Sequence, residues 1–272
     1  MGGGAAEKGP GYPSETMMDD DALFALGTMT HSSPAMFERR RRILREARRM
    51  IGEGRPDDFN IRELCRRAGV SSRTVYNAFG GKEAVIALAI KDYFEAFHQS
   101  MLFVSDEDSL EGALERAMAA TLRNLQIPNY LRVVTALYFS STLDPRIRHV
   151  LLDIGRRQWL AWLQLLRSRR QLERGIEPDQ IAVDLSDLQF AKVHQWGLGV
   201  LPGDRLVDAT ALSVLTHLAG ATRGAARIAV RARLNALGRD TAEWRDFIGG
   251  IRMRIDQHWV KPAAVQHDEN PL

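Results

Sequence analysis

Residues 71–82 group small hydrogen-bonding side chains around one guanidinium and one carboxamide. Arg73 and Asn77 lie four residues apart, so on a helix they share one face. A guanidinium can pair with guanine O6 and N7, and a carboxamide can pair in the same way with adenine N6 and N7. Thr74, Tyr76 and Lys82 suit phosphate oxygens, which fix the register of a complex without reading its sequence. The candidate contact residues for duplex DNA are therefore Ser71, Ser72, Arg73, Thr74, Tyr76, Asn77 and Lys82.

The residues just before this segment predict a short helix. Its apolar side chains recur at i, i+3, i+4 and i+7, which places Ile61, Leu64, Cys65 and Ala68 in one stripe. Asn60 is a good N-cap residue, with Glu63 placed as in a capping box. Gly69 follows the last turn, where a left-handed residue ends many helices. We interpret Cys65 as a small core side chain rather than a redox switch, because a thiol in apolar company reacts poorly.

A second short helix follows that turn. Ser71 can cap it, and Val75 and Phe79 lie one turn apart on its inner face. With Val75 turned inward, a step of about 100° per residue sends Arg73 and Asn77 to the opposite side. Two short helices joined by a tight turn that contains glycine form a helix-turn-helix.

An arginine-rich helix is expected upstream. Ser33 and Pro34 mark its start, and glycines at 52 and 54 mark its end. Its inward stripe is expected to comprise Phe37, Leu44, Ala47 and Ile51. Residues 34–82 hold 13 Lys and Arg against 6 Asp and Glu, an excess typical of nucleic-acid binders. We expect Arg42 to contact the DNA backbone, although such arginines can also form a merely solvated face.

The run from Ile61 to Lys82 resembles the DNA-binding signature of TetR-type transcriptional regulators. The matching residues are Ala68, Gly69, Val70, Ser71, Thr74, Tyr76, Phe79 and Lys82. Asn60, Cys65 and the pair Asn77-Ala78 depart from the usual residues, and the last pair bears on which operator is read. The close resemblance covers roughly residues 34–95, and beyond them only the expected architecture agrees.

The remaining chain predicts an all-α protein in which a helix-turn-helix domain precedes a helical effector-binding and dimerisation domain. We expect a flexible tail at 1–33, the DNA-binding domain at 34–81 and a linking helix at 82–104. Residues 105–260 are expected to form the effector and dimer domain, and 261–272 a disordered tail. Helices are expected near 109–126, 129–141, 145–173, 178–200, 204–237 and 241–259, because prolines and glycines separate these periodic segments.

The resemblance implies a homodimer, with the helices near 178–200 and 204–237 forming the interface. It also implies a ligand pocket without saying which residues line it. We take as candidates the aromatic residues of the central helices, namely Tyr138, Trp159, Trp162, Phe190, His194 and Trp196. We expect few charged residues to face inward, and therefore a hydrophobic effector of low charge. The alternative is that these aromatic side chains are ordinary core.

Catalytic and metal chemistry find no support in the sequence. None of the motifs GxSxG, HExxH or the P-loop is present, and the histidines show no paired metal-ligand spacing. We therefore expect no enzyme activity, no metal and no cofactor. No apolar run approaches a membrane span, and a single cysteine is consistent with a reducing cytoplasm.

The sequence thus favours a dimeric, ligand-responsive transcriptional repressor that binds a near-palindromic operator. An activator or a ligand-independent regulator would carry the same DNA-binding residues. A helical enzyme or small-molecule carrier is a further alternative, in which the helix-turn-helix serves only as packing. Sequence-specific DNA binding would separate the regulators from that last class.

Overall fold

A computed structural model describes residues 34–53 and 59–258 of the chain. Within these residues every extended regular element is a helix, and the only β-type pairing is an isolated bridge between Leu172 and Thr222. The expected all-α class is confirmed. The expected tails at 1–33 and 261–272 lie outside the described residues.

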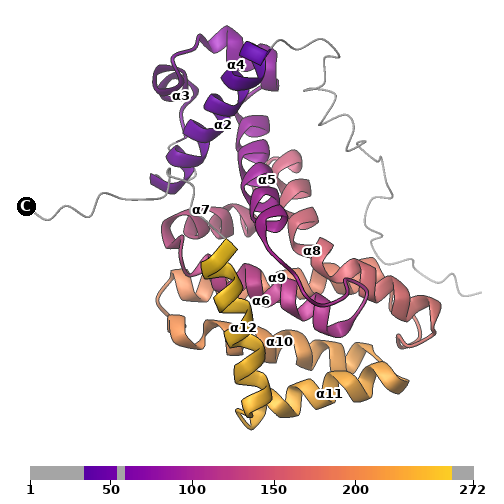
Figure 1. The fold of residues 1–272 in the computed structure, drawn as a ribbon. Coiled ribbons are helices and arrows are strands. Elements are labelled where there is room, and N and C mark those ends of the chain that lie inside the picture. Colours follow the sequence, from indigo (N-terminus) through magenta and orange to yellow (C-terminus); the bar gives the residue numbers. More distant parts are fainter. Residues whose placement is uncertain (1–33, 54–58, 259–272) are drawn as a thin grey trace, which may run out of the picture.

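The helices follow one another along an elongated molecule (Figure 1). Their bounds are α2 Pro34–Glu53, α3 Ile61–Ala68, α4 Ser72–Phe79, α5 Lys82–Ser100, α6 Leu110–Asn124, α7 Pro128–Tyr138, α8 Pro145–Ser168, α9 Pro178–Gly197, η2 Gly203–Arg205, α10 Leu206–Ala221, α11 Gly224–Gly238 and α12 Ala242–His258. Helices α2, α3 and α4 form one end of the molecule, and α10, α11 and α12 lie at the other. Helix α5 runs from the first group into the body.

Two apolar cores meet along α5. One joins α2, α3 and α4 to α5, α7 and parts of α8 and α9, and includes Val75, Phe79 and Ile90. The other joins α6, α8, α9, α10, α11 and α12, and includes Trp159 and Trp244. Phe97, near the end of α5, belongs to the second core. Helix α5 therefore packs into both cores, as do α8 and α9.

The inward stripe of α2 differs from the expectation at one position. Leu44, Ala47 and Ile51 are buried as expected, but Phe37 is exposed and Ile43 is fully buried instead. Ile43 lies beside Leu44 and one turn from Ala47, whereas Phe37 lies in the first turn of α2, before the residues that contact α4. The position along the helix, and not its periodicity, leaves Phe37 in solvent.

The prediction of a single helix over 204–237 is wrong, because two helices occupy this range. Helix α10 ends at Ala221, and α11 begins at Gly224, whose φ of 60° is left-handed. The break is held by backbone pairing with a distant turn. The N–H of Glu173 donates to the carbonyl of Ala221 at 2.9 Å. In the opposite direction, the N–H of Arg223 donates to the carbonyl of Gln171 at 2.8 Å. These bonds satisfy backbone groups that a continuous helix would have used internally.

Helices α8 and α9 approach closely at one glycine. A Cβ added to Gly155 would lie 2.5 Å from Ser186 Oγ and 2.7 Å from Ser186 Cβ. Ser186 is buried and its hydroxyl is bonded to the Ala182 carbonyl, so it has little room to move. The spacing of these two helices therefore depends on the missing side chain.

No helix among the described residues is both long enough and apolar enough to cross a membrane.

We expect Gly155→Ala to lower the free energy of unfolding by about 1–3 kcal/mol, because the added methyl group overpacks the α8–α9 contact. Urea denaturation at fixed protein concentration measures this change. Gly249→Ala in α12 is the matched control, since nothing lies within 4 Å of its added Cβ. The control should gain up to about 1 kcal/mol from helix propensity. Equal effects of the two substitutions would contradict the proposed close contact.

Candidate DNA-binding site

Local hydrogen bonds define both ends of α3. Asn60 Oδ1 accepts the N–H of Arg62 at 2.8 Å, which makes Asn60 the N-cap. Gly69 adopts a left-handed conformation with φ of 61°, and the N–H of Val70 donates to the Cys65 carbonyl at 3.0 Å. A residue with a Cβ would be strained at Gly69, so this glycine sets the turn into α4.

Helix α4 is held by a cap at one end and by two buried side chains. Ser71 Oγ accepts the N–H of Thr74 at 3.2 Å. Val75 and Phe79 are fully buried in the core shared with α2 and α5. Gly80 ends the helix in a left-handed conformation, and its N–H donates to the Tyr76 carbonyl at 2.8 Å. With the inner face fixed, the direction of the outer face is fixed as well.

The residues expected to contact DNA gather on and beside α4. Arg73, Tyr76 and Asn77 are exposed, as are Ser71 and Ser72. Thr74 is half-buried, and its hydroxyl lies 2.9 Å from that of Ser71. Lys82 is half-buried at the start of α5, and Arg42 is exposed on α2. In the part of the chain that the structure describes, the Arg73 and Asn77 side chains bond to no other residue, so both are open to a partner.

Arg40 is a residue of this region that the sequence analysis did not single out. Its Nη1 donates to the carbonyl of Ala78 at 3.0 Å, and its guanidinium carbon lies 4.6 Å from the centre of the Phe79 ring. Burial lowers the pKa of Arg40, with a smaller opposing effect from Asp92. Arg40 therefore ties α2 to the last turn of α4. The sequence feature that could have identified Arg40 is its position one turn before Ile43 and Leu44, on the apolar side of α2.

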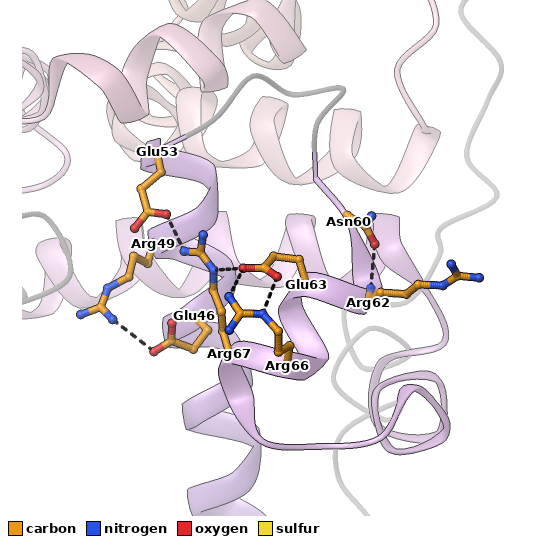
Figure 2. Close-up of polar contacts among 8 residues, drawn as sticks. All are labelled: Glu46, Arg49, Glu53, Asn60, Arg62, Glu63, Arg66 and Arg67. Carbon is orange, nitrogen blue, oxygen red and sulfur yellow. Dashed lines mark hydrogen bonds and ion pairs between the residues drawn. The ribbon is translucent and has the colours of Figure 1, made fainter.

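Several of the basic residues are already neutralised within the domain (Figure 2). Glu63 accepts hydrogen bonds from Arg66 and Arg67, at 2.6 Å to Arg66 Nη2 and 2.7 Å to Arg67 Nε. Arg67 also donates to Glu53 at 2.5 Å, and Arg49 lies 3.6 Å from Glu46. In Figure 2 the Arg62 side chain points away from this network.

The two guanidiniums beside Glu63 lower the pKa of its carboxyl to about 2. Glu63 therefore stays ionised at neutral pH, and Arg66 and Arg67 remain matched. Among the described residues, the basic side chains of this end that have no carboxylate within ion-pair distance include Arg39, Arg42, Arg45, Arg62, Arg73 and Lys82. Arg73 lies on α4 and Lys82 begins α5 just after it, where phosphate groups of a bound duplex would need cations.

The six aromatic residues proposed as pocket residues do not converge on one cavity. Trp159 and Trp162 are buried in the core of α6, α8 and the C-terminal helices. Tyr138 stacks on Phe190 with ring centres 4.0 Å apart. His194 Nδ1 lies 3.3 Å from Thr135 Oγ1. Trp196 is half-buried and packs against the first of the two cores, which joins α2, α3 and α4 to α5 and α7. Only Phe190 borders the cavity described next.

That cavity has a volume of about 80 Å³ and lies between α5, α6, α7, α8 and α9. Four phenylalanines line it, together with charged and amide side chains: Phe94, Phe97, Phe103, Phe190, Glu95, His98, Arg116, Asn124, Arg157, Gln158 and Gln189. Its position depends on how five helices pack together, so no local pattern could reveal it. Among the described residues, no group of three His, Cys, Asp or Glu could hold a metal ion.

Comparisons with known proteins agree with this geometry. Residues 43–89 match the family of bacterial regulatory proteins named tetR. The sequence matches no curated protein. A solved structure from Rhodococcus sp., assigned to the TetR family of transcriptional regulators, shares 16% identity with a TM-score of 0.51. It covers 65% of this chain and 97% of its own.

A TetR-family transcriptional regulator from Streptomyces coelicolor shares 16% identity with a TM-score of 0.49, covering 80% of this chain and 90% of its own. At such low identity a structural likeness concerns the fold, and the match over residues 43–89 concerns the domain that holds α3 and α4. The match over residues 43–89 confirms the family resemblance for the segment that holds α3 and α4. This segment of the chain is similar to the tetR family of bacterial regulatory proteins.

Proposed function

We propose that this chain is a cytoplasmic, dimeric transcriptional repressor, which binds a near-palindromic operator through α4 and leaves it when a small-molecule effector binds. The observation that carries the proposal is the outer face of α4, where Arg73 and Asn77 are exposed while Val75 and Phe79 are buried. A helix that presents a guanidinium and a carboxamide in this way can read base edges in the major groove.

Two copies of the chain are needed because one short helix reads few base pairs. Two-fold symmetry would place two α4 helices in successive major grooves, about 34–36 Å apart. We propose that α9, α10 and α11 supply the interface. In support, Leu212 on α10 is 51% exposed and Ile228 on α11 is 73% exposed. Exposed alanines at 225, 229 and 232 extend the apolar face of α11.

Effector binding is proposed to act through α5. This helix begins at Lys82, directly after α4, and four of its residues line the cavity: Phe94, Glu95, Phe97 and His98. A ligand in the cavity would shift α5 and thereby change the separation of the two α4 helices. A 100-fold loss of operator affinity requires a coupling free energy of only about 2.7 kcal/mol.

Selection of bound sequences from a random duplex pool tests the proposal most directly. A two-fold symmetric motif would support dimeric operator binding, and the absence of any enriched motif would contradict it. Repression itself is tested by transcription in vitro from a promoter that overlaps the selected site. Increased transcription would favour the activator alternative.

Arg73→Ala should weaken binding to the selected operator by about 1–3 kcal/mol and relax base preference at one position, because a contact to a base edge is lost. Fluorescence anisotropy on operator and random duplexes measures both effects. Lys82→Ala is the matched comparison. It should weaken binding to all duplexes and reduce the salt slope by about 1, as expected of a phosphate contact. An equal loss on operator and random DNA would refute base reading by Arg73.

Leu212→Asp and Ile228→Asp should each raise the dimer dissociation constant by at least about 100-fold, because an interface would bury an unpaired charge. Sedimentation velocity at micromolar concentration measures the assembly mass. Met253→Asp, at an equally exposed position of α12, serves as the control and should leave the dimer intact. A dimer that survives both Leu212→Asp and Ile228→Asp would place the interface elsewhere.

A further inference from the structure

Arg123 is a fully buried cation close to the cavity. Its exposed fraction is 0%, and it lies in the last turn of α6. The guanidinium carbon lies 4.2 Å from the centre of the Phe94 ring, 4.5 Å from that of Phe97 and 5.2 Å from that of Tyr93. Two of these three rings also line the cavity.

The guanidinium of Arg123 is only partly satisfied. Nη2 donates to Asn124 Oδ1 at 3.1 Å, whereas Nε and Nη1 have no hydrogen-bond partner. None of the ion pairs among the described residues includes Arg123. Its pKa falls to about 10, mainly through burial, and the nearby groups that oppose this effect are the hydroxyls of Tyr93 and Tyr130. Aromatic rings stabilise a cation, but an unmatched buried charge remains costly.

Arg116, whose guanidinium lines the cavity, also has no carboxylate partner among the described residues. Arg116 donates through Nη1 to the carbonyl of Gly112 at 3.0 Å and stacks over Phe103 at 4.7 Å. Its Nε is buried and has no partner. The neighbouring carboxylate Glu115 is engaged by Arg254 at 2.6 Å and by the backbone of Val104 and Ser105.

Among the described residues that line the cavity, the one carboxylate is already matched. Glu95 lies 3.7 Å from Arg157 and 3.9 Å from Lys91. His98 adds no positive charge at neutral pH, because burial and the adjacent Arg116 and Arg157 lower its pKa. The surroundings of the cavity therefore hold more positive than negative charge, contrary to the expectation that few charges face inward.

We propose that this cavity binds a small organic carboxylate, whose apolar part packs against the phenylalanine rings and whose negative charge is matched by Arg116 and Arg123. Asn124 both lines the cavity and bonds to Arg123, so it links the deeper cation to the ligand. The volume of about 80 Å³ favours a short aliphatic chain over a larger, fused-ring ligand. A dianion such as phosphate would lose more hydration among the rings.

Isobutyrate and its neutral isostere isobutyramide are suitable probes for calorimetry on the full chain at constant ionic strength. We expect isobutyrate to bind at least about tenfold more tightly, since hydrogen bonds to charged groups add this much. It should also raise the melting temperature, while the amide should not. Equal affinity for the two probes, or preference for inorganic phosphate, would overturn the proposal.

Arg123→Met tests the role of the buried cation with a side chain of similar length. The preference for isobutyrate should fall to within about threefold, and the ligand-free variant should melt no lower than the parent, because an unmatched charge is removed. Arg252→Met, on the exposed side of α12, is the matched control and should keep the preference. If Arg123→Met does not fold, the same preference is measured with Arg116→Gln. A preference that persists in both cavity variants would overturn the assignment.

The regulatory meaning of this site rests on the proposed effector response, and a separate measurement distinguishes the two. Operator affinity is measured with and without saturating isobutyrate. Tight, Arg123-dependent binding without any change in operator affinity would support the ligand class while refuting effector-driven release through this cavity. Loss of operator affinity that is equal with isobutyrate and isobutyramide would refute the ligand class alone.

Discussion

The burial of Val75 and Phe79 determines how the DNA-binding end of this protein is presented. These two side chains are one turn apart on a helix of only eight residues, and such a helix has little stability of its own in water. Packing against α2 and α5 therefore provides the order that α4 lacks by itself. Arg40 adds a hydrogen bond and a ring contact at the last turn. Because the inner face is fixed from two sides, the outer face has one orientation relative to the rest of the chain.

Helix α5 extends this constraint to the body of the protein. Val85 and Ile90 pack in the core that holds α4, and Phe97 packs in the core of the C-terminal helices. Phe94 and Phe97 also border the cavity and contact the Arg123 guanidinium. A change in the cavity would therefore act on a helix that also packs in the core of α4. This arrangement offers a physical path for the proposed coupling between the two sites.

Charge is organised differently at the two ends. Around α3 the excess of basic residues is reduced locally by Glu53 and Glu63, which pair with Arg66 and Arg67. Arg42 and Arg73 are exposed, and water solvates them when no DNA is bound. Around the cavity, by contrast, the Arg123 guanidinium and the Nε of Arg116 are buried, and water cannot solvate them equally well. An unpaired arginine thus costs little free energy at the end with α4, where it is exposed. Beside the cavity the free-energy cost of an unpaired arginine is larger, and a bound anion could offset that cost.

The sequence by itself determined the elements whose causes are local. Caps at Asn60 and Ser71, the left-handed turn at Gly69 and the spacing of Val75 and Phe79 depend on neighbours within a few residues, and α3 and α4 begin and end where these signals predict. Helical periodicity elsewhere was sufficient for the all-α class. The tertiary structure alone decided what depends on distant residues. Residues 171–173 pair with 221–223 and divide the expected long helix, and five helices enclose the cavity beside Arg123. Periodicity reports which face of a helix is apolar, but it contains no information on which other helix covers that face.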